Sequence, residues 1–301
     1  MLDPADLYQV EVEPTPAAPV MLLALDGFVD AGRAAGLVVD QLLPEPDSAP
    51  VATFDADQLV DYRSRRPIMR FERDHWASYA TPELAVHAMT DTAGTSYLLL
   101  SGPEPDVQWE RFAAAVGELI DRLGVTLTVG LNAIPMAVPH SRPLGVTIHG
   151  TRSELVEGHP QWFGTVDVPG SAAALIQLRL GEAGRDGVGL AVHVPHYLSR
   201  SEYPQAALAL IHQIEAVTGL SLPTAALDQA AERALVEIEE QITSSEQVGN
   251  IVRALEEQYD TASAELGSPG GLSAGGLPSG DDIAAEFERY LTDRDQRGSS
   301  D

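Results

Sequence analysis

Cysteine and lysine are both missing from this sequence of 301 residues. The absence of cysteine excludes disulfides, thiolate metal sites and cysteine nucleophiles. The absence of lysine excludes a Schiff-base amine and the lysine of a phosphate-binding P-loop. All 18 basic residues are therefore arginines. The G-x-G-x-x-G pattern of dinucleotide-binding proteins is missing as well. Several large classes of enzyme are excluded on these grounds.

Long apolar runs are also missing. The longest, such as residues 20–25 and 97–100, are far shorter than the roughly 20 residues that cross a bilayer. The first 14 residues are acidic and have no apolar core, so we do not interpret them as a signal peptide. Positive charge is scarce, because 45 carboxylates against 18 arginines leave a net charge of −27. Nucleic acids and acidic membranes bind through basic side chains. We therefore expect neither as a partner, and we expect a cytoplasmic protein.

Between residue 20 and about residue 218, short apolar segments alternate with amphipathic ones. This alternation is typical of a mainly parallel sheet with helices on both faces. The predicted strands are 20–25, 51–54, 96–102, 125–135, 144–151 and 187–195. The predicted helices are 31–43, 107–123 (capped by Asp106 and ended by Gly124), 171–180 and 204–218. We predict a three-layer α/β fold, with a mainly parallel or mixed sheet flanked by helices as in phosphorylases and hydrolases.

The flanking segments differ in character from this α/β domain, which we place at residues 20–222. Residues 1–19 hold four prolines and predict an extended N-terminal arm. Over 223–266 the strand pattern stops, and apolar residues recur at spacings of three and four on both sides of a break after Ile242. This spacing predicts two helices that form a C-terminal hairpin.

The C-terminal end is polar and acidic. Residues 267–280 are rich in glycine, serine and proline and predict a flexible linker, and 281–301 predict a short acidic helix and a tail. Residues 226–301 contain 17 acidic and 5 basic side chains. A solvated surface that keeps the protein soluble is the favoured interpretation, and a docking segment for a basic partner is the alternative.

The turn from the first predicted strand to its helix is a candidate site, because amide groups at a helix N-terminus bind anions. Asp26, Gly27, Asp30 and Gly32 form this turn. Its two carboxylates repel phosphate, however. They fit better as a helix cap at Asp30 and a turn-forming side chain at Asp26. We favour a structural role for the turn over ligand binding.

Arginines gather in the segment 61–73, which contains Arg63, Arg65 and Arg66. Such a cluster can hold a phosphate or carboxylate through paired hydrogen bonds. The favoured interpretation is that these arginines neutralise acidic groups within one subunit or across a subunit boundary.

Further polar residues follow other predicted strands, at the edge where ligands of open α/β sheets bind. Asn132, His140 and Arg142 follow one strand, and Gly102 and Glu104 end another. His193 and His196 have too few potential partners to predict a metal site, and Ser101 lacks the context of a catalytic nucleophile. We therefore predict no catalytic residue, metal or cofactor.

Five segments, taken in order, resemble the proteasome assembly chaperone family, and most closely its actinobacterial branch. The order of the segments is more specific than any one of them, and the resemblance extends from about residue 19 to 265. The segments are LDGFVDAG (25–32), FDADQLVDYRSRRP (54–67), LLLSGPEPDVQWERFAAAV (98–116), PHSRPLGVTIHGTR (139–152) and HVPHYLSRSEYPQAALALI (193–211).

This resemblance implies an α/β domain similar to nucleoside phosphorylases, a helical C-terminal part and a tendency to form homo-oligomers. Eukaryotic members of the family escort proteasome α subunits during ring assembly without performing chemistry. Archaeal relatives bind proteasomes through a C-terminal tail with a penultimate tyrosine. Here ten residues follow Tyr290-Leu291, so the resemblance does not extend to that mode of docking.

Two functions follow as hypotheses. The first is a non-catalytic, homo-oligomeric, chaperone-like factor that binds another protein, with proteasome subunits as candidate partners and a trimer as the working assumption. It would use the turn at 26–32, the segment 132–142 and the acidic helix at 281–295. The alternative is an enzyme or small-molecule binder. Its phosphorylase-like cleft would hold a nucleoside or a related ligand through Asn132, His140 and Arg142, with Asp30 or Glu104 as acid or base.

Overall fold

The computed structural model describes residues 2–12, 18–43, 49–160, 163–244 and 246–266. Among these residues, eight strands form one sheet in the order β1-β3-β6-β7-β2-β8-β10-β9. The central strands β7, β2, β8 and β10 are parallel, and the outer strands pair antiparallel. The strands of the sheet are β1 (Tyr8–Val10), β2 (Val20–Asp26), β3 (Ala52–Phe54), β6 (Ala85–Thr90), β7 (Ser96–Pro103), β8 (Leu127–Met136), β9 (Val146–Gly150) and β10 (Asp186–Pro195). The linker and the acidic helix that the sequence predicts at 267–280 and 281–295 lie outside the described residues.

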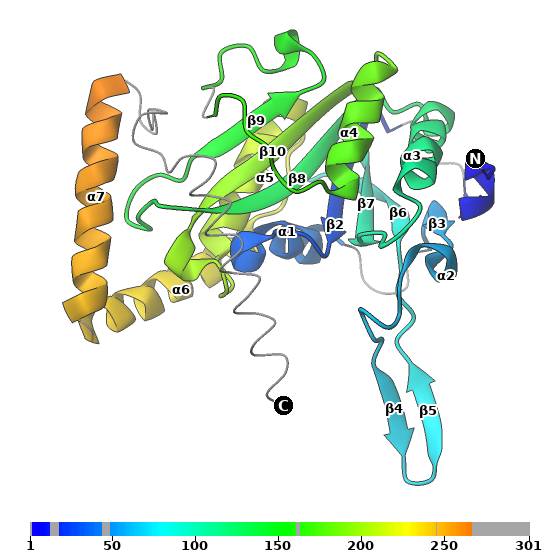
Figure 1. Ribbon diagram of the computed structural model, residues 1–301, viewed down its shortest axis with the longest axis horizontal. Coiled ribbons are helices and arrows are strands. Elements are labelled where there is room, and N and C mark those ends of the chain that lie inside the picture. Colours follow the sequence, from blue (N-terminus) through cyan, green and yellow to red (C-terminus); the bar gives the residue numbers. More distant parts are fainter. Residues whose placement is uncertain (1, 13–17, 44–48, 161–162, 245, 267–301) are drawn as a thin grey trace.

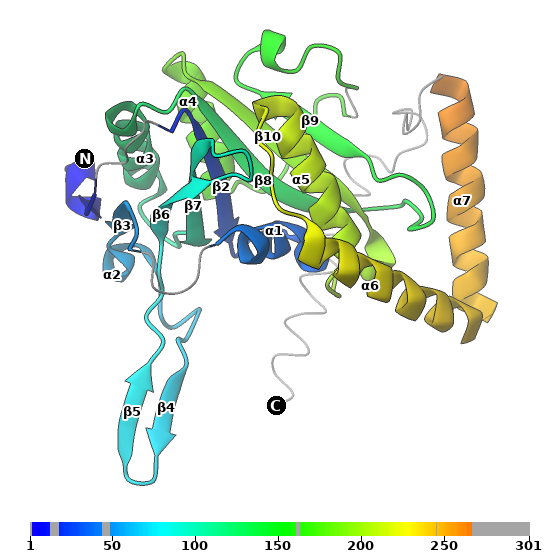
Figure 2. The same cartoon turned by 180° about the vertical axis from the view of Figure 1, so that it is seen from behind.

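Helices cover both faces of this sheet (Figure 1). α1 and α5 pack on one face, which is turned to the viewer in Figure 2, and α3 and α4 pack on the other. The longer helices are α1 (Ala34–Leu42), α3 (Trp109–Leu123), α4 (Ala172–Glu182), α5 (Pro204–Thr218), α6 (Ala225–Ser244) and α7 (Glu246–Leu266). Shorter helical turns are η1 (Pro4–Leu7), η2 (Ala31–Arg33), α2 (Ala56–Leu59), η3 (Ser153–Leu155) and η4 (His196–Leu198).

The strands feed two hydrophobic cores. Successive side chains of a strand point to opposite faces, so Leu22 and Leu99 enter the core beneath α1 and α5, whereas Met21 and Leu98 enter the core beneath α3. Because the central strands are buried on both faces, they appear in the sequence as continuous apolar runs. The predicted three-layer α/β fold with a mixed sheet is confirmed.

The sequence predicted the end of α3 correctly but not its start. Gly124 lies in the left-handed region at φ 69° and donates its N–H to Ile120 and Asp121, as expected for a residue that ends a helix. The predicted cap at Asp106 is wrong. Its carboxylate instead accepts the N–H of Asp61 at 2.7 Å, and the helix begins three residues later, at Trp109.

Two helices follow the α/β layers, in the region where the sequence predicts a helical hairpin. α6 leaves the end of α5, and α7 turns sharply away from it, so that the two helices diverge (Figure 1). Leu227 of α6 joins the core beneath α5. Tyr259 of α7 packs on Met136 and Val138. Each helix is therefore attached to the α/β layers through its own apolar contacts.

A second, two-stranded sheet projects from the molecule (Figure 1). It consists of β4 (Met69–Glu72) and β5 (His75–Tyr79), and we call it the ribbon. No local pattern in the sequence predicts the ribbon, because all nine of its strand residues are exposed. A strand with no buried face lacks the alternation of apolar and polar residues that marks a half-buried one. The prediction also missed β6 and the short edge strand β1, which lies in the predicted N-terminal arm.

Gly102, near the end of β7, lies very close to the backbone of Glu83 and Leu84. Its φ is +135°, and an added Cβ would lie 2.2 Å from the carbonyl oxygen of Glu83. We expect Gly102→Ala to lower the free energy of unfolding by more than about 2 kcal/mol, because it combines backbone strain with a clash against backbone. Urea unfolding measures this change.

Gly94→Ala is the matched control, because Gly94 also has a positive φ, +89°, but nothing lies within 4 Å of its added Cβ. We expect a loss of about 1 kcal/mol there, from strain alone. Equal losses in the two variants would contradict the close approach at Gly102.

Candidate functional site

The turn after β2 is closed by its own carboxylate. Asp30 accepts the backbone N–H groups of Ala35 and Gly36, both at 2.9 Å, and so occupies the N-terminus of α1 that could otherwise bind an anion. Burial is the main cause of a raised pKa at Asp30, opposed by these two hydrogen bonds. Gly32 donates to the carbonyl of Ser199, and its added Cβ would lie 2.8 Å from Cβ of Tyr203. Both candidates therefore join α1 to its surroundings.

Arg65 ties together the ends of two strands. Its guanidinium donates to the carbonyl oxygens of Asp26 and Glu104, and it pairs with the carboxylate of Asp106 at 2.7 Å. Gly27 must lack a side chain here, because an added Cβ would lie 2.7 Å from Nη1 of Arg65.

The other two predicted arginines lie at the surface. The side chain of Arg63 is 88% exposed and lies 3.8 Å from the carboxylate of Asp61, and Arg66 is exposed. The structure therefore does not bring the three arginines together around one anion. Arg65 acts within the subunit, and Arg63 and Arg66 point to solvent at the base of the ribbon.

A pocket of about 100 Å³ lies between α4 and the face of the sheet formed by β8 and β10. Three predicted residues, Asp30, Glu104 and Asn132, line it. Oε1 of Glu104 accepts the N–H of Ala172 at 2.6 Å, at the start of α4, and burial is the main cause of a raised pKa at this carboxyl. Oδ1 of Asn132 accepts the N–H of Ala133 at 2.8 Å.

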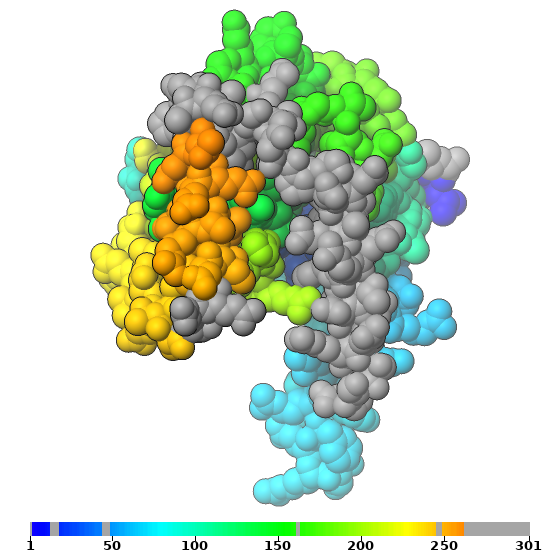
Figure 3. Space-filling model, turned by 60° about the vertical axis from the view of Figure 1, so that its left-hand side comes forward, coloured from blue at the N-terminus to red at the C-terminus, as the bar shows by residue number. Residues whose placement is uncertain are grey.

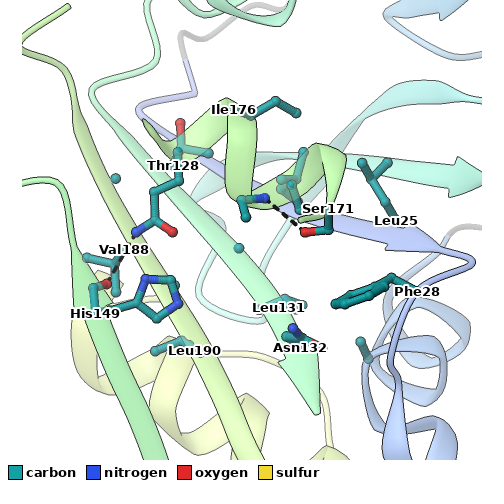
Figure 4. A pocket seen from close by; sticks show the side chains of 18 of the residues that line it. Leu25, Phe28, Thr128, Leu131, Asn132, His149, Ser171, Ile176, Val188 and Leu190 are labelled. Atoms are coloured by element: carbon teal, nitrogen blue, oxygen red, sulfur yellow. Dashed lines mark hydrogen bonds between the residues drawn. The ribbon is translucent and has the colours of Figure 1, made fainter. Parts of the chain in front are cut away.

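Four further polar residues line the pocket, Thr128, His149, Ser171 and Gln177, and none of them was predicted as a site residue. His149 of β9 projects over the sheet, and Ser171 caps α4 by accepting the N–H of Ala174 at 3.1 Å (Figure 4). Burial lowers the pKa of His149 below 6.5. Ser171 could have been predicted, because a serine directly before a helical segment is a typical helix cap. No local signal distinguished His149, which becomes a pocket residue only through the pairing of β9 with β10.

His140 and Arg142 lie outside this pocket and face the C-terminal helices. The backbone N–H of His140 donates to the hydroxyl of Tyr197, and its ring lies 3.4 Å from a carboxylate oxygen of Glu239 on α6. Arg142 donates two hydrogen bonds, at 2.7 and 2.8 Å, to the carboxylate of Asp260 on α7. The expected grouping of Asn132 with His140 and Arg142 around a nucleoside is therefore wrong, because these two side chains bind α6 and α7.

The remaining histidine candidates do not form a metal site. His193 is fully buried in β10, with Nε2 2.7 Å from the hydroxyl of Thr147, and burial lowers its pKa to about 4. His196 begins the following turn, η4. No group of three potential metal ligands occurs within the described part of the chain. Among the same residues, no helix has both the length and the apolarity to cross a membrane.

The ribbon exposes large apolar side chains. Phe71 and Trp76 form a T-shaped pair with ring centres 5.1 Å apart, and yet they are 55% and 63% exposed. Ile68, beside β4, is 80% exposed. Contiguous exposed apolar groups of this kind mark surfaces that bind other molecules.

Comparisons with known proteins found a matching family and similar solved structures. The PAC2 family model matches residues 24–242. No curated protein matches the sequence. The solved structure of a protein of unknown function from Mycobacterium tuberculosis is 43% identical, with a TM-score of 0.81, and the match covers 87% of this chain and 91% of that one.

Two further solved structures are similar over most of their length. A protein of unknown function from Corynebacterium glutamicum is 37% identical, with a TM-score of 0.80, and the match covers 86% of this chain and 98% of that one. A proteasome-assembly chaperone homologue from Mycobacterium tuberculosis is 27% identical, with a TM-score of 0.70, and the match covers 77% of this chain and 99% of that one.

The buried neutral state of His193 predicts a pH dependence of stability. In the unfolded chain this side chain takes up a proton near pH 6.5, whereas in the folded protein it does so only at about pH 4. Between these values the unfolded state binds more protons, so the contribution of His193 to stability is present above about pH 6.5 and is lost as the pH falls. We expect His193→Gln to reduce the loss of stability between about pH 7 and pH 4.5 by about 2 to 3 kcal/mol, measured by urea unfolding.

His75→Gln serves as the control, because the side chain of His75 is 64% exposed. Comparison of the two variants separates the effect of burial at His193 from the effect of replacing a histidine as such. An unchanged pH dependence in His193→Gln would show that His193 is not held neutral by the fold.

Proposed function

Because the chain belongs to the PAC2 family, we propose that it is a homo-oligomeric, chaperone-like factor that binds another protein, with proteasome subunits as its partner, and performs no chemistry. The match of the family over residues 24–242 supports this proposal. So does the 27% identical relative, which is itself described as a proteasome-assembly chaperone homologue.

The ribbon is the observation that carries the proposal. It extends away from the α/β layers, and in Figure 3 it forms the cyan protrusion at the lower end of the molecule. Its exposed apolar side chains gain free energy when another surface covers them, at roughly 25 cal/mol for each Å² removed from water. Aromatic residues of this kind dominate the energetics of protein interfaces. The exposed apolar residues of the ribbon and its base are Ile68, Met69, Phe71, Trp76 and Tyr79.

Charge favours an acidic surface as the contact of the ribbon. Residues 61–80 contain five arginines and three carboxylates, in a chain whose net charge is −27. One acidic surface with exposed apolar groups belongs to this chain itself: on α6, Leu235 and Val236 lie beside Glu239 and Glu240 in a shallow groove. A contact between two different surfaces of identical chains closes into a ring when the rotation between neighbours allows it. Homo-oligomerisation through the ribbon fits this pattern.

The environments of three candidate groups, Asp30, Arg65 and Arg142, support a role without chemistry. Asp30 caps α1, Arg65 binds backbone carbonyls, and Arg142 pairs with Asp260. A general base or a phosphate-binding side chain must have atoms within hydrogen-bond reach of the substrate. The hydrogen-bonding groups of these three side chains are already engaged by other groups of the protein.

The oligomer is tested with the double variant Phe71→Ser/Trp76→Ser. We expect native mass spectrometry and light scattering to show a multimer for the wild-type protein and a smaller species for the variant, because the variant removes the apolar centre of the proposed contact. Val168→Ser is the control, since Val168 is 68% exposed elsewhere on the surface. A variant with the wild-type mass would contradict the role of the ribbon.

The partner is tested by co-expressing the tagged full-length chain with the proteasome α and β subunits of its own organism. We expect α or β subunits to co-purify in near-stoichiometric amount. Their absence, with an intact homo-oligomer, would contradict the proposed partner and leave the self-association of the chain standing.

A further inference from the structure

The floor of the pocket beneath α4 contains three glycines, beside the side chains of Leu23, Leu25 and Thr128. Gly130 of β8 pairs with Gly189 of β10, and Gly187 lies two residues before it on the same face of the sheet. The opposite face of these strands is filled by Val129 and Leu190, which belong to the core beneath α5. The helix above contributes small side chains at its start, Ala173 and Ala174, and larger ones farther along, Ile176, Gln177 and Leu180. Small residues on both sides leave a gap between sheet and helix.

Rings bound this gap. An added Cβ on Gly189 would lie 2.2 Å from the ring of His149, so this imidazole lies directly on the backbone of β10. Figure 4 shows the ring of Phe28 at the opposite end of the pocket. Above Gly130 the space is open, because the nearest atom to an added Cβ is 3.9 Å away. The pocket is therefore a slot that is open above the backbone of Gly130.

Several polar groups at the slot retain hydrogen-bonding capacity, among them those of Glu104, Asn132 and Ser171. The hydrogen bonds of Glu104 and Asn132 use Oε1 and Oδ1, and within the described residues Oε2 of Glu104 and the amide NH₂ of Asn132 have no partner. The hydroxyl of Ser171 accepts one N–H and remains able to donate its own proton. The slot thus offers a carboxylate acceptor at Glu104 and donors at Asn132 and Ser171.

Charge and size narrow the choice of occupant. The lining contains the carboxylates of Asp30 and Glu104 and no arginine, so an anion would meet like charge. Burial raises the pKa of both carboxyl groups, which agrees with this effect of like charge. The volume of about 100 Å³ is well below that of pockets for drug-sized ligands, roughly 300 to 1,000 Å³, and suits a single ring. A whole nucleoside or nucleotide exceeds it.

We propose that this slot binds one planar, uncharged heteroaromatic ring that carries an N–H donor, a ligand class that goes beyond the protein-binding function. The ring lies against the glycine backbone between Phe28 and His149. Its N–H donates to Oε2 of Glu104, and a ring nitrogen or carbonyl accepts from Asn132 or Ser171.

Three small probes test the proposal on the full-length protein by ligand-observed NMR titration. Nicotinamide is planar, neutral and carries an N–H donor, and we expect saturable binding with a dissociation constant on the order of 1 mM, as for fragment-sized ligands. Nicotinate has nearly the same shape but is anionic, and cyclohexanecarboxamide keeps the amide but is not planar. We expect each of these two to bind at least roughly tenfold more weakly.

Variants connect the binding to the slot. Gly130→Leu fills the open space above the floor and should abolish nicotinamide binding, and Gly130→Ala adds one methyl group and should weaken it. Gly164→Leu is the control for the same substitution at a glycine that does not line the pocket. Nothing lies within 4 Å of the added Cβ of Gly164. Glu104→Gln can still accept the N–H of Ala172. The variant should reduce the ratio between the dissociation constants of nicotinate and nicotinamide. Loss of structure alone would weaken the binding of both probes and would not produce this effect.

The proposal is overturned if nicotinamide shows no saturable binding up to about 10 mM, a range that covers fragment affinities. It is also overturned if cyclohexanecarboxamide or nicotinate binds as well as nicotinamide, or if a folded Gly130→Ala and Gly130→Leu pair binds like the wild-type protein. None of these results bears on the ribbon or on protein binding, so the two proposals fail separately.

Discussion

The guanidinium of Arg65 is the group on which both candidate surfaces depend. It binds the carbonyl oxygens of Asp26 and Glu104, where β2 and β7 end, and the carboxylate of Asp106. Carbonyl groups at strand ends lose their ladder partners and must find others when water is excluded. Arginine can satisfy several at once because its donors form a rigid fork. The backbone of Glu104 is thereby held where its side chain reaches α4, and the same contact anchors the base of the ribbon.

Several other arginines make connections of the same kind between elements distant in sequence. Arg179 of α4 binds Glu110 of α3, Arg185 binds Asp121 of α3, and Arg152 binds Asp186 of β10. Arg142 binds Asp260 of α7. Exposed pairs of this kind contribute only about 0 to 1 kcal/mol each. In a chain with a net charge of −27, their effect is to place the few positive charges where two acidic elements meet.

The two candidate surfaces differ in the physics of binding. The ribbon offers exposed apolar area and positive charge on a projecting element, which favours a large partner with an acidic surface. The slot beneath α4 offers a narrow, mostly apolar space with few polar groups, which favours a small flat ligand. They lie on different elements, so a protein partner and a small ligand can occupy the molecule together.

Local patterns in the sequence were sufficient for the layers of the fold. Strands such as Val20–Asp26 and helices such as Trp109–Leu123 were predictable because burial on both faces, or on one helical face, imposes a period on neighbouring residues. The ribbon was not predictable in this way, because a strand without a buried face carries no such period. The cap at Asp106 was predicted wrongly, because that carboxylate binds Asp61 and Arg65 instead of the nearby helix.

The sequence alone thus established an acidic α/β chain without cysteine or lysine and the order of its main strands and helices. It also indicated the family, through the order of five short segments. The tertiary structure decided which polar groups meet. Arg65 reaches Glu104 across 39 residues and Arg142 reaches Asp260 across 118, whereas Asp30 and Asn132 remain at the pocket. Apolar periodicity is a local property of the chain, but the partner of a polar side chain depends on how distant segments pack, and no spacing in the sequence encodes that choice.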